Sequence, residues 1–519
     1  MRIKTLKIWQ FKNLRDFEVK FDETSLTTVL LGQNGTGKSN LLEALVRIFR
    51  DLDLGEPPSL KYEISYECRG REIHIAAREP GKSSSVDITV DGQPISLSSF
   101  SKDPTRTFLP SNVFGYYSGP SGRFESHFAR HQEKFYRQLL ENSSGDALRP
   151  LFYARLIHSQ FVLLAFFYEE NEQATAFLKK YLGIEDLESV LFVLNQPPWS
   201  SKQGDPRFWF AKGTVQGFLD RLFRYALAPL RLKQRIDVGL AKSTVQERLY
   251  LFLKDRKALK RLRVHYESPA DFFKALESTY LSKLLTEVRI RVQVRDCTGA
   301  LTFTELSEGE QQLLTVLGLL RFTREDEALF LLDEPDTHLN PMWALHYLDL
   351  LSDVVGEQKT SHIIMTTHDP LTIAGLTRNQ VRVLVRDENT GKVSAEVPEH
   401  DPKGMGVRGI LTSDLFGLRS DLDLATLQLL DEQRDLANKA DLTENDRERL
   451  AALREQTGAI DFSGRVSDPL VSEVIKALAS SPEFRESRAP ILNSDQREKR
   501  KRIVLDAIRS ARAKEEIAE

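Results

Sequence analysis

Cysteine is almost absent from this sequence. Only Cys68 and Cys297 occur among its 519 residues, and they lie far apart along the chain. A disulfide framework and a zinc site with several cysteine ligands are therefore excluded. The segment Met1–Lys4 alternates charged and apolar residues, unlike the apolar centre of a signal peptide. Together these features predict a cytoplasmic protein.

Long hydrophobic runs are also missing. The most hydrophobic stretch, Phe161–Tyr168, ends at Glu169-Glu170. Its length is less than half of the roughly 20 residues that a membrane helix needs. We therefore expect no membrane partner. The hydrophobic content of 41% is nevertheless enough for more than one packed core in a chain of this length.

Neither sign of charge predominates. The chain has 72 Lys and Arg against 75 Asp and Glu, so only a local patch could attract nucleic acid. Two basic stretches stand out, Lys254–Arg263 and Arg497–Arg502, and such stretches can make salt-sensitive contacts with phosphates. The alternative is that each is a solvated helix face.

A glycine-rich loop carries the clearest chemical signal. Gly32–Ser39 matches G-x-x-x-x-G-K-[ST] and lies between a predicted strand, Thr27–Leu31, and a predicted helix from Leu41. In this motif, backbone amides converge on phosphates, the lysine reaches the outer phosphates and the hydroxyl binds Mg²⁺. The predicted contacts to ATP are Gly32, Gln33, Asn34, Gly35, Thr36, Gly37, Lys38, Ser39 and Asn40.

Two carboxylates follow a continuous apolar run. Ala328–Leu332 has the composition of a strand buried on both faces, and Asp333 and Glu334 come directly after it. Ligands of open α/β sheets bind at the carboxyl ends of strands. We expect Asp333 to bind Mg²⁺ and Glu334 to orient or deprotonate the attacking water. A strand that simply ends in an acidic turn is the alternative.

Two weaker signals accompany this strand. Leu306–Gln312 precedes an amphipathic helix, but Ser307 and Glu310 have the spacing of an ordinary capping box. His368 follows the apolar run Ile363–Met365, where it could touch the outermost phosphate, although a lone histidine is more often structural.

The four motifs in this order resemble the ABC-type ATPases. They are a Walker A motif (Gly32–Ser39), an LSGGQ-like signature (Leu306–Gln311), a Walker B strand (Leu329–Glu334) and a switch histidine (His368). Phe11–Leu14 and Gly37–Ala44 resemble the DNA-associated branch of RecF, Rad50 and the overcoming-lysogenisation-defect ATPases, and are less similar to transporter subunits.

The resemblance implies a homodimer, or a higher oligomer, whose heads meet around ATP. Ser307 and Gly309 would then complete the site of a partner subunit, His368 would sense the γ-phosphate, and Lys12 would approach the phosphates. The catalytic residues would be Glu334, Lys38 and His368. Glu308 and Glu310 depart from the transporter signature, and only Tyr116–Gly119 lies near the place of a glutamine loop.

The segment Gly409–Leu418 and the residues after it resemble the C-terminal region of PtuA, the ATPase family of Septu antiphage systems, which also occur beside retrons. That resemblance implies a separate HNH nuclease of the PtuB type as partner. It also implies, where a retron is present, a reverse transcriptase with its RNA and DNA product. No acidic pattern of a fused TOPRIM domain follows His368, so we expect no intrinsic nuclease.

The predicted architecture is an α/β, ABC-type P-loop ATPase head with a helical insertion and a C-terminal helical unit. The expected boundaries are 1–123 for the first half of the head, 124–285 for the helical insertion, 286–416 for the second half and 417–519 for the helical unit.

Three functions fit this sequence. The leading hypothesis is a defence ATPase that controls a separate nuclease. A RecF-like repair or recombination ATPase and a nucleotide-gated scaffold with little turnover are the alternatives, and Glu334 argues against the scaffold.

Overall fold

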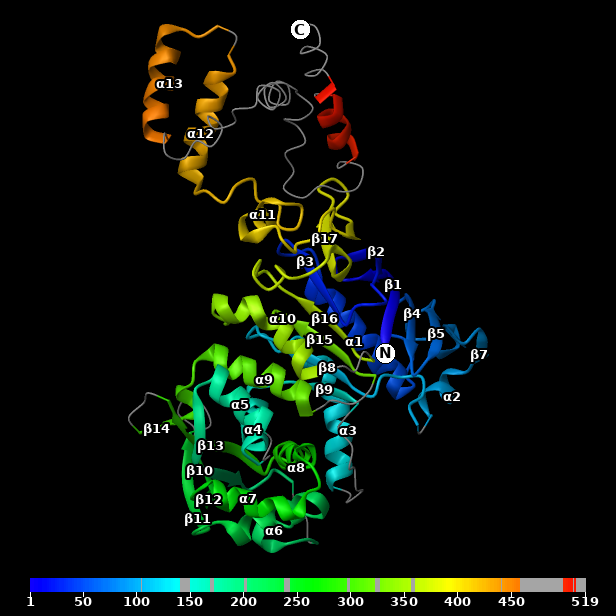
Figure 1. Ribbon diagram of the computed structural model, residues 1–519. Coiled ribbons are helices and arrows are strands. Elements are labelled where there is room, and N and C mark those ends of the chain that lie inside the picture. The colour runs from blue at the N-terminus through cyan, green and yellow to red at the C-terminus, as the bar shows by residue number, and fades with distance from the viewer. Residues whose placement is uncertain are drawn as a thin grey trace. The chain divides into compact units, whose positions relative to one another are not determined.

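The chain divides into two units in the computed structural model (Figure 1). The first contains Met1–Leu30 and Gly37–Thr372, and the second contains Leu31–Thr36 and Ile373–Glu519. The structure describes residues 1–103, 105–140, 150–168, 172–199, 203–237, 243–295, 299–322, 327–355, 360–439, 441–457, 498–506 and 508–509.

An antiparallel sheet begins the first unit. Its strand order is β2-β1-β4-β5-β6-β7. Asp91 and Gly92, both with positive φ, form the turn between β6 and β7, where Val90 pairs with Gln93. Antiparallel hairpins therefore lie on both sides of the glycine-rich loop in the sequence. The strands are β1 (Arg2–Phe11), β2 (Leu14–Lys20), β4 (Tyr62–Cys68), β5 (Arg71–Ala77), β6 (Val86–Val90) and β7 (Gln93–Ile95).

A parallel sheet forms the centre of the ATPase head. Its strands in the first unit run in the order β3-β16-β15-β8-β9, and every neighbouring pair is parallel. β15 and β16 are buried along their whole length, as their continuous apolar sequences predict. All carboxyl ends therefore meet at one edge. The strands are β3 (Thr27–Gly32), β8 (Val113–Tyr117), β9 (Leu151–Tyr153), β15 (Leu329–Asp333) and β16 (His362–Thr366).

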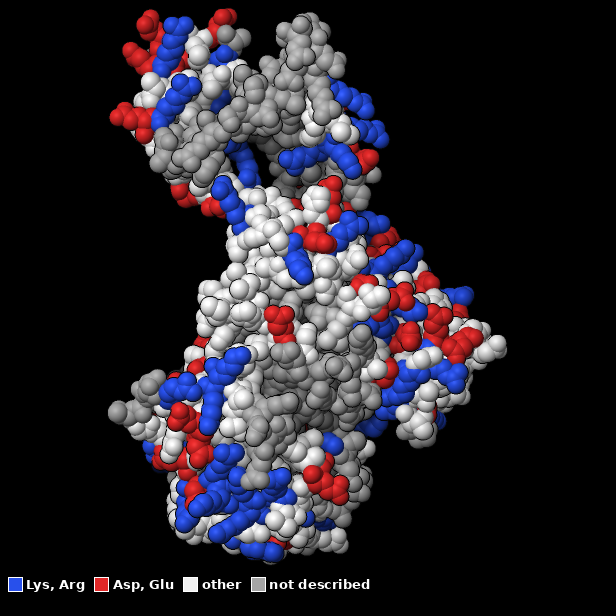
Figure 2. All heavy atoms as spheres, in the orientation of Figure 1, with Lys and Arg blue, Asp and Glu red and all other residues white. Residues whose placement is uncertain are grey.

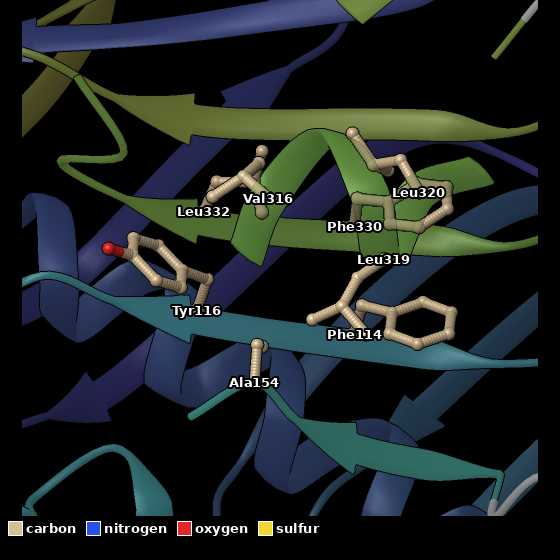
Figure 3. A pocket seen from close by; sticks show the side chains of 9 residues that line it. Phe114, Tyr116, Ala154, Val316, Leu319, Leu320, Phe330 and Leu332 are labelled. Carbon is tan, nitrogen blue, oxygen red and sulfur yellow. The ribbon is translucent and has the colours of Figure 1, made fainter. Parts of the chain in front are cut away.

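One helix of the head, α9, packs on the middle of this sheet. It encloses, with β8 and β15, an apolar cavity of about 20 Å³ (Figure 3). Phe114 of β8 and Phe330 of β15 stack beside it with ring centroids 5.0 Å apart. The helices of the head are α1 (Lys38–Leu54), α2 (Leu97–Ser101), α3 (Ala129–Leu140), α9 (Glu308–Phe322) and α10 (Pro341–Val355).

The insertion has a sheet as well as helices, so the prediction of a helical insertion at 124–285 is wrong. Its five strands are ordered β11-β12-β10-β13-β14, all antiparallel. In Figure 1 they flank the helices of the insertion. These elements are β10 (Ile184–Asn195), β11 (Leu230–Asp237), β12 (Ser243–Leu253), β13 (Leu285–Val294), β14 (Ala300–Thr302), α4 (Leu156–Tyr168), α5 (Glu172–Tyr181), α6 (Gly213–Tyr225), α7 (Arg256–Arg261) and α8 (Pro269–Leu281).

Two features explain this error. β11 is an edge strand with both faces largely exposed, so its sequence lacks the alternation of a half-buried strand. β13 does alternate, but it pairs with β10 and not with a strand of the head. The expected boundary at 285/286 therefore falls at the start of an insertion strand.

Within the described residues, the second unit contains the strands β17 and β18, the helices α11, α12 and α13, and a further helical segment at 498–506. α12 and α13 pack through Leu436, Leu450 and Leu453. Thr443 and Asp446 form a capping box before α13. Its elements are β17 (Val381–Arg386), β18 (Val393–Glu396), α11 (Gly406–Thr412), α12 (Leu424–Ala437) and α13 (Glu444–Thr457).

Short 3₁₀ helices complete the two units. They are Ser83–Ser85, Glu125–Phe128, Pro206–Phe208, Leu262–His265, Phe303–Glu305 and Arg378–Gln380. Within the described ranges, none of the helices combines the length and the apolar character that crossing a bilayer requires.

A glycine makes the close contact between the head and the insertion. A Cβ atom on Gly318 of α9 would lie 2.0 Å from Cγ1 of Val162 on α4. We expect Gly318→Ala to lower the free energy of unfolding by about 1–3 kcal/mol, the usual cost of overpacking. Chemical denaturation measures this change.

Gly217→Ala is the matched control, because Gly217 lies within α6 and a Cβ there would meet nothing within 4 Å. It should raise stability by about 0.4–1 kcal/mol, through the entropy of the unfolded chain. Equal effects of the two substitutions would contradict the contact.

Candidate nucleotide-binding site

At two positions of the glycine-rich loop, a positive φ coincides with a close approach of other atoms, so only glycine fits. Gly32 has φ +143°, and a Cβ there would lie 2.5 Å from the carbonyl oxygen of Leu384. Gly37 has φ +103°, and a Cβ there would lie 2.8 Å from Oδ1 of Asn13. Between them, the Thr36 hydroxyl donates to the carbonyl oxygen of Gln33 at 2.8 Å. The loop thus has the close-packed backbone expected of a phosphate-binding turn.

Lys38 is a buried cation at the start of α1. Its side chain lies close enough to Asp333 and Glu334 for their charges to raise its pKa, but burial is the larger effect and the pKa is lowered overall. Asn40, one turn into the same helix, donates to Oδ1 of Asn13 at 2.6 Å. The structure therefore brings Lys38 together with both predicted Walker B carboxylates.

Asp333 is a buried carboxylate at the carboxyl end of β15. It is 1% exposed, and burial raises its pKa, while hydrogen bonds with the hydroxyls of Thr366 and Ser39 act in the opposite direction. The Thr366 hydroxyl donates to Oδ1 at 2.6 Å. The other oxygen, Oδ2, is buried and has no hydrogen-bond partner among the described residues.

This arrangement fits a magnesium ion. The unpaired carboxylate oxygen of Asp333 and the hydroxyl of Ser39 are two oxygen ligands of the kind that Mg²⁺ prefers. Water and substrate phosphates commonly supply its remaining ligands. In the described part of the chain, no group of three or more His, Cys, Asp or Glu could bind a metal ion alone. Ser39 and Asp333 would therefore hold Mg²⁺ only together with the nucleotide.

Glu334 and His368 form a pair beside this carboxylate. Nε2 of His368 lies 3.4 Å from Oε1 of Glu334, and both side chains are partly exposed. The hydrogen bond with His368 is the main cause of the lowered pKa of Glu334. Glu334 is thus kept ionised, as a residue that orients or deprotonates water must be.

Thr366 positions both carboxylates and was missed in the sequence. Its hydroxyl contacts Asp333, and it also accepts from the backbone amide of Glu334 at 3.0 Å. Glu334 has φ +52°, a conformation that costs free energy for a residue with a side chain. The amide contact helps to hold Glu334 in this conformation.

The signature residues are held at the start of α9. The Ser307 hydroxyl and Glu310 form the capping box that the sequence allowed as an alternative, with Oγ to Oε2 at 2.8 Å. Ser307 remains exposed and Gly309 is buried, where a Cβ would lie 2.5 Å from the carbonyl oxygen of His338. The signature is thus packed on the loop that follows Walker B in its own chain.

Gln312 connects the signature helix to the site, and this role was not predicted. Its side chain accepts from the amide of His338 at 3.2 Å and donates to the carbonyl oxygen of Glu334 at 3.5 Å. A hydrogen bond with Gln312 also opposes the effect of burial, which raises the pKa of Tyr116 on β8. The second glutamine of a Glu-Gln-Gln sequence after the signature was the available signal.

Lys12 pairs with Glu43. It lies in the turn between β1 and β2 with φ +53°, and its ammonium group contacts Oε2 of Glu43 on α1.

Tyr117, at the end of β8, pairs in register with Asp333, and the next amide, of Ser118, donates to the carbonyl oxygen of Asp333 at 3.2 Å. The loop after Tyr117 therefore starts beside the Walker B carboxylate.

The basic stretches differ in how much the structure shows. Lys254–Arg263 begins directly after β12 and covers α7 and the start of the 3₁₀ helix Leu262–His265, and Figure 2 shows Lys and Arg gathered over this part of the insertion. Lys254, Lys257 and Arg261 are exposed, whereas Arg256 pairs with Asp186. In Arg497–Arg502, Arg497 lies outside the described residues and the rest is helical.

Comparisons with known proteins agree with this geometry. The protein family described as "AAA domain, putative AbiEii toxin, Type IV TA system" matches residues 27–374. The matched range contains every predicted site residue except Lys12. It also spans more than half of the chain.

Two curated relatives match shorter segments. Septu protein PtuA from Bacillus mycoides (strain KBAB4) is 28% identical over 156 residues, which are 28% of this chain and 21% of the relative. The DNA replication and repair protein RecF from Trichodesmium erythraeum (strain IMS101) is 37% identical over 108 residues, 18% of this chain and 26% of the relative. The chain thus spans about a fifth to a quarter of the length of these relatives.

Solved structures give a partial likeness. The SMC head domain from Thermotoga maritima is 15% identical with a TM-score of 0.32, covering 77% of this chain and 100% of that one. An SMC head bound to the C-terminal winged-helix domain of ScpA is 13% identical with a TM-score of 0.34, covering 77% and 98%.

Replacing His368 should shift the pH dependence of ATP hydrolysis. His368→Ala removes the hydrogen bond that lowers the pKa of Glu334, so that pKa rises. The acid limb of kcat/KM should therefore move to higher pH, because protonated Glu334 cannot accept a proton. A pH–rate profile measures this.

His346→Ala serves as control, since His346 lies on α10 and faces Asp349. It should leave the profile unchanged. If the acid limb does not move in His368→Ala, then His368 does not control the ionisation of Glu334.

Proposed function

We propose, from the premise that this chain belongs to the AAA-domain family described as a putative AbiEii toxin of type IV toxin–antitoxin systems, that it is the ATP-hydrolysing subunit of an antiphage defence complex. In this proposal two copies meet head to head around ATP and control a separate HNH-type nuclease. The observation that carries the ATPase assignment is the convergence of Lys38, Asp333 and Glu334 at one edge of the parallel sheet.

The side chains at this edge divide the chemistry between them. Lys38 neutralises charge on the outer phosphates, and Ser39 and Asp333 hold the magnesium ion. The ion, when bound, offsets the negative charge that develops on the transferred phosphoryl group. Glu334 orients and deprotonates the attacking water, and His368 keeps Glu334 ionised before the nucleotide arrives.

Dimerisation is proposed from the position of the signature. Ser307 is exposed at the first turn of α9, where backbone amides and the helix dipole favour a phosphate. Within one chain this turn packs on the loop at His338. A second copy would bring Ser307 and Gly309 to the γ-phosphate bound by the first, so hydrolysis would need two chains.

The similarity to Septu protein PtuA supports the defence role. In that role the nucleotide state of the head would restrain or release a nuclease carried on another polypeptide. The exposed basic residues Lys254, Lys257 and Arg261 would supply nonspecific contacts to nucleic acid. The similarity to RecF favours a second candidate, an ATPase of DNA repair or recombination.

Two substitutions separate nucleotide binding from hydrolysis. Lys38→Ala removes the cation that faces the phosphates and should abolish ATP binding. Glu334→Gln keeps the binding contacts and should retain ATP in a stable dimer, while hydrolysis falls by roughly 10²–10⁴-fold, the usual contribution of a general base. Equilibrium ATP binding, phosphate release and native mass measure these effects.

Lys82→Ala and Glu133→Gln are suitable controls, because both side chains are exposed and each pairs with a residue near it in sequence. Both controls should match the wild-type protein. Vigorous hydrolysis by Lys38→Ala and Glu334→Gln would refute the site, and a wild-type protein that binds ATP without turnover would favour the nucleotide-gated scaffold.

Native purification from the host tests the partner. We expect the tagged protein to bring down a small HNH-type nuclease, with a reverse transcriptase and its DNA product where a retron is present. Mass spectrometry and nucleic-acid sequencing identify these components. Recombination proteins on chromosomal DNA would instead establish the RecF-like role.

A further inference from the structure

Glu43 is a buried carboxylate that none of the nucleotide motifs explains. It lies on α1 and is 1% exposed. It follows Ser39 by four residues, so the two side chains share one face of the helix. A buried charge this close to the predicted magnesium ligand requires partners.

Three basic side chains surround Glu43. Lys12 contacts Oε2, and Nε2 of His127 lies 3.2 Å from the same oxygen. Nε of Arg123 lies 3.3 Å from Oε1. Burial acts to raise the pKa of Glu43, but the hydrogen bonds from His127 and Lys12 prevail and the pKa is lowered. Glu43 is therefore ionised, and Lys12 and Arg123 alone exceed its single charge.

Arg123 is the loosest of these partners. Oε1, the oxygen that faces it, is buried and has no hydrogen-bond partner among the described residues. Arg123 itself is 43% exposed. If it left, Lys12 and His127 would still compensate Glu43, so its departure would not leave a buried charge alone.

The position of Arg123 is close to the hydrolytic centre. Its guanidinium lies 5.6 Å from the ring centroid of Tyr117, the residue that pairs in register with Asp333. Its positive charge also acts to lower the pKa of both Asp333 and Glu334, as a smaller effect than burial or hydrogen bonding. Arg123 thus contacts Glu43 and also lies close enough to the Walker B carboxylates for its charge to act on them.

The segment that carries Arg123 is exposed. It belongs to the loop after β8, where residues 120–123 are exposed and a Cβ on the neighbouring Gly122 would meet nothing within 4 Å. A guanidinium also forms paired hydrogen bonds with phosphate oxygens, which an ammonium group cannot do.

We propose that Glu43 stores Arg123 in the nucleotide-free head and that Arg123 moves to the outermost phosphate of bound ATP. Arg123 then distinguishes ATP from ADP and stabilises the charge that develops during hydrolysis. This inference rests on the proposed ATPase function and assigns a further phosphate-contacting residue to the same site.

Arg123→Gln tests the inference in the full-length protein. We expect its preference for ATP over ADP to fall by about tenfold, the effect of losing one hydrogen bond to a charged group, with ADP affinity unchanged. The value of kcat should fall by about 10²-fold or more, as when a group that stabilises transition-state charge is removed. Competition binding and steady-state hydrolysis measure both quantities.

Two further variants make the result specific. Arg130→Gln removes an exposed arginine that pairs with Glu56 on the neighbouring segment, and it should behave as the wild type. Arg123→Lys keeps the charge beside Glu43 and guards against misfolding of the first variant. It should retain more of the ATP preference than Arg123→Gln, yet remain slow because the forked donor is lost.

The possible results test the role of Arg123 separately from the ATPase function. Wild-type rates and wild-type ATP preference in both Arg123 variants would overturn the inference while leaving the ATPase function intact. A wild-type protein that neither binds nor hydrolyses ATP would overturn both. Loss of affinity for ATP and ADP to the same extent would also overturn it, because Arg123 would then not distinguish the outermost phosphate.

Discussion

The burial of the Asp333 carboxylate is the constraint on which the site depends. A buried charge costs free energy unless hydrogen bonds and an opposite charge compensate it. Those partners come from other segments: Thr366 from β16, Ser39 and Lys38 from α1. Thr366 reaches Asp333 because the two residues are aligned in the parallel register of β15 and β16. The remaining oxygen is left for a cation, so the same register that orders the sheet also defines the chemistry.

From this carboxylate, contacts lead to the signature helix and then to the insertion. Gln312 joins the first turns of α9 to the Glu334 and His338 backbone, and Gly309 packs on the same loop. Two turns further along α9, Gly318 packs on α4 of the insertion. A change in the loop after Walker B would therefore act on α9, the helix that contacts both the site and the insertion. The proposed control of a nuclease needs a connection of this kind.

Much of the site could be predicted because its signals are local in sequence. The glycine loop, the apolar strand before Asp333 and Glu334, and the position of His368 each depend on a few consecutive residues. Thr366 and Gln312 were missed because their roles come from strand register and helix packing, which no single motif records. Arg123 lies in a loop without periodicity, and its partner Glu43 is distant in sequence. The sheet of the insertion was missed for a similar reason, since β11 is an exposed edge and β13 finds its partner in β10.

The central claim is that Ser39 and Asp333 bind the magnesium ion of ATP at the carboxyl edge of the parallel sheet. Calorimetric titration of the wild-type protein with a non-hydrolysable ATP analogue, in Mg²⁺ and in a metal chelator, tests it most directly. We expect tight binding in Mg²⁺ and much weaker binding in the chelator, because the buried oxygen of Asp333 then faces the phosphates without a cation between them. Equal affinity under both conditions would show that Ser39 and Asp333 do not bind the ion.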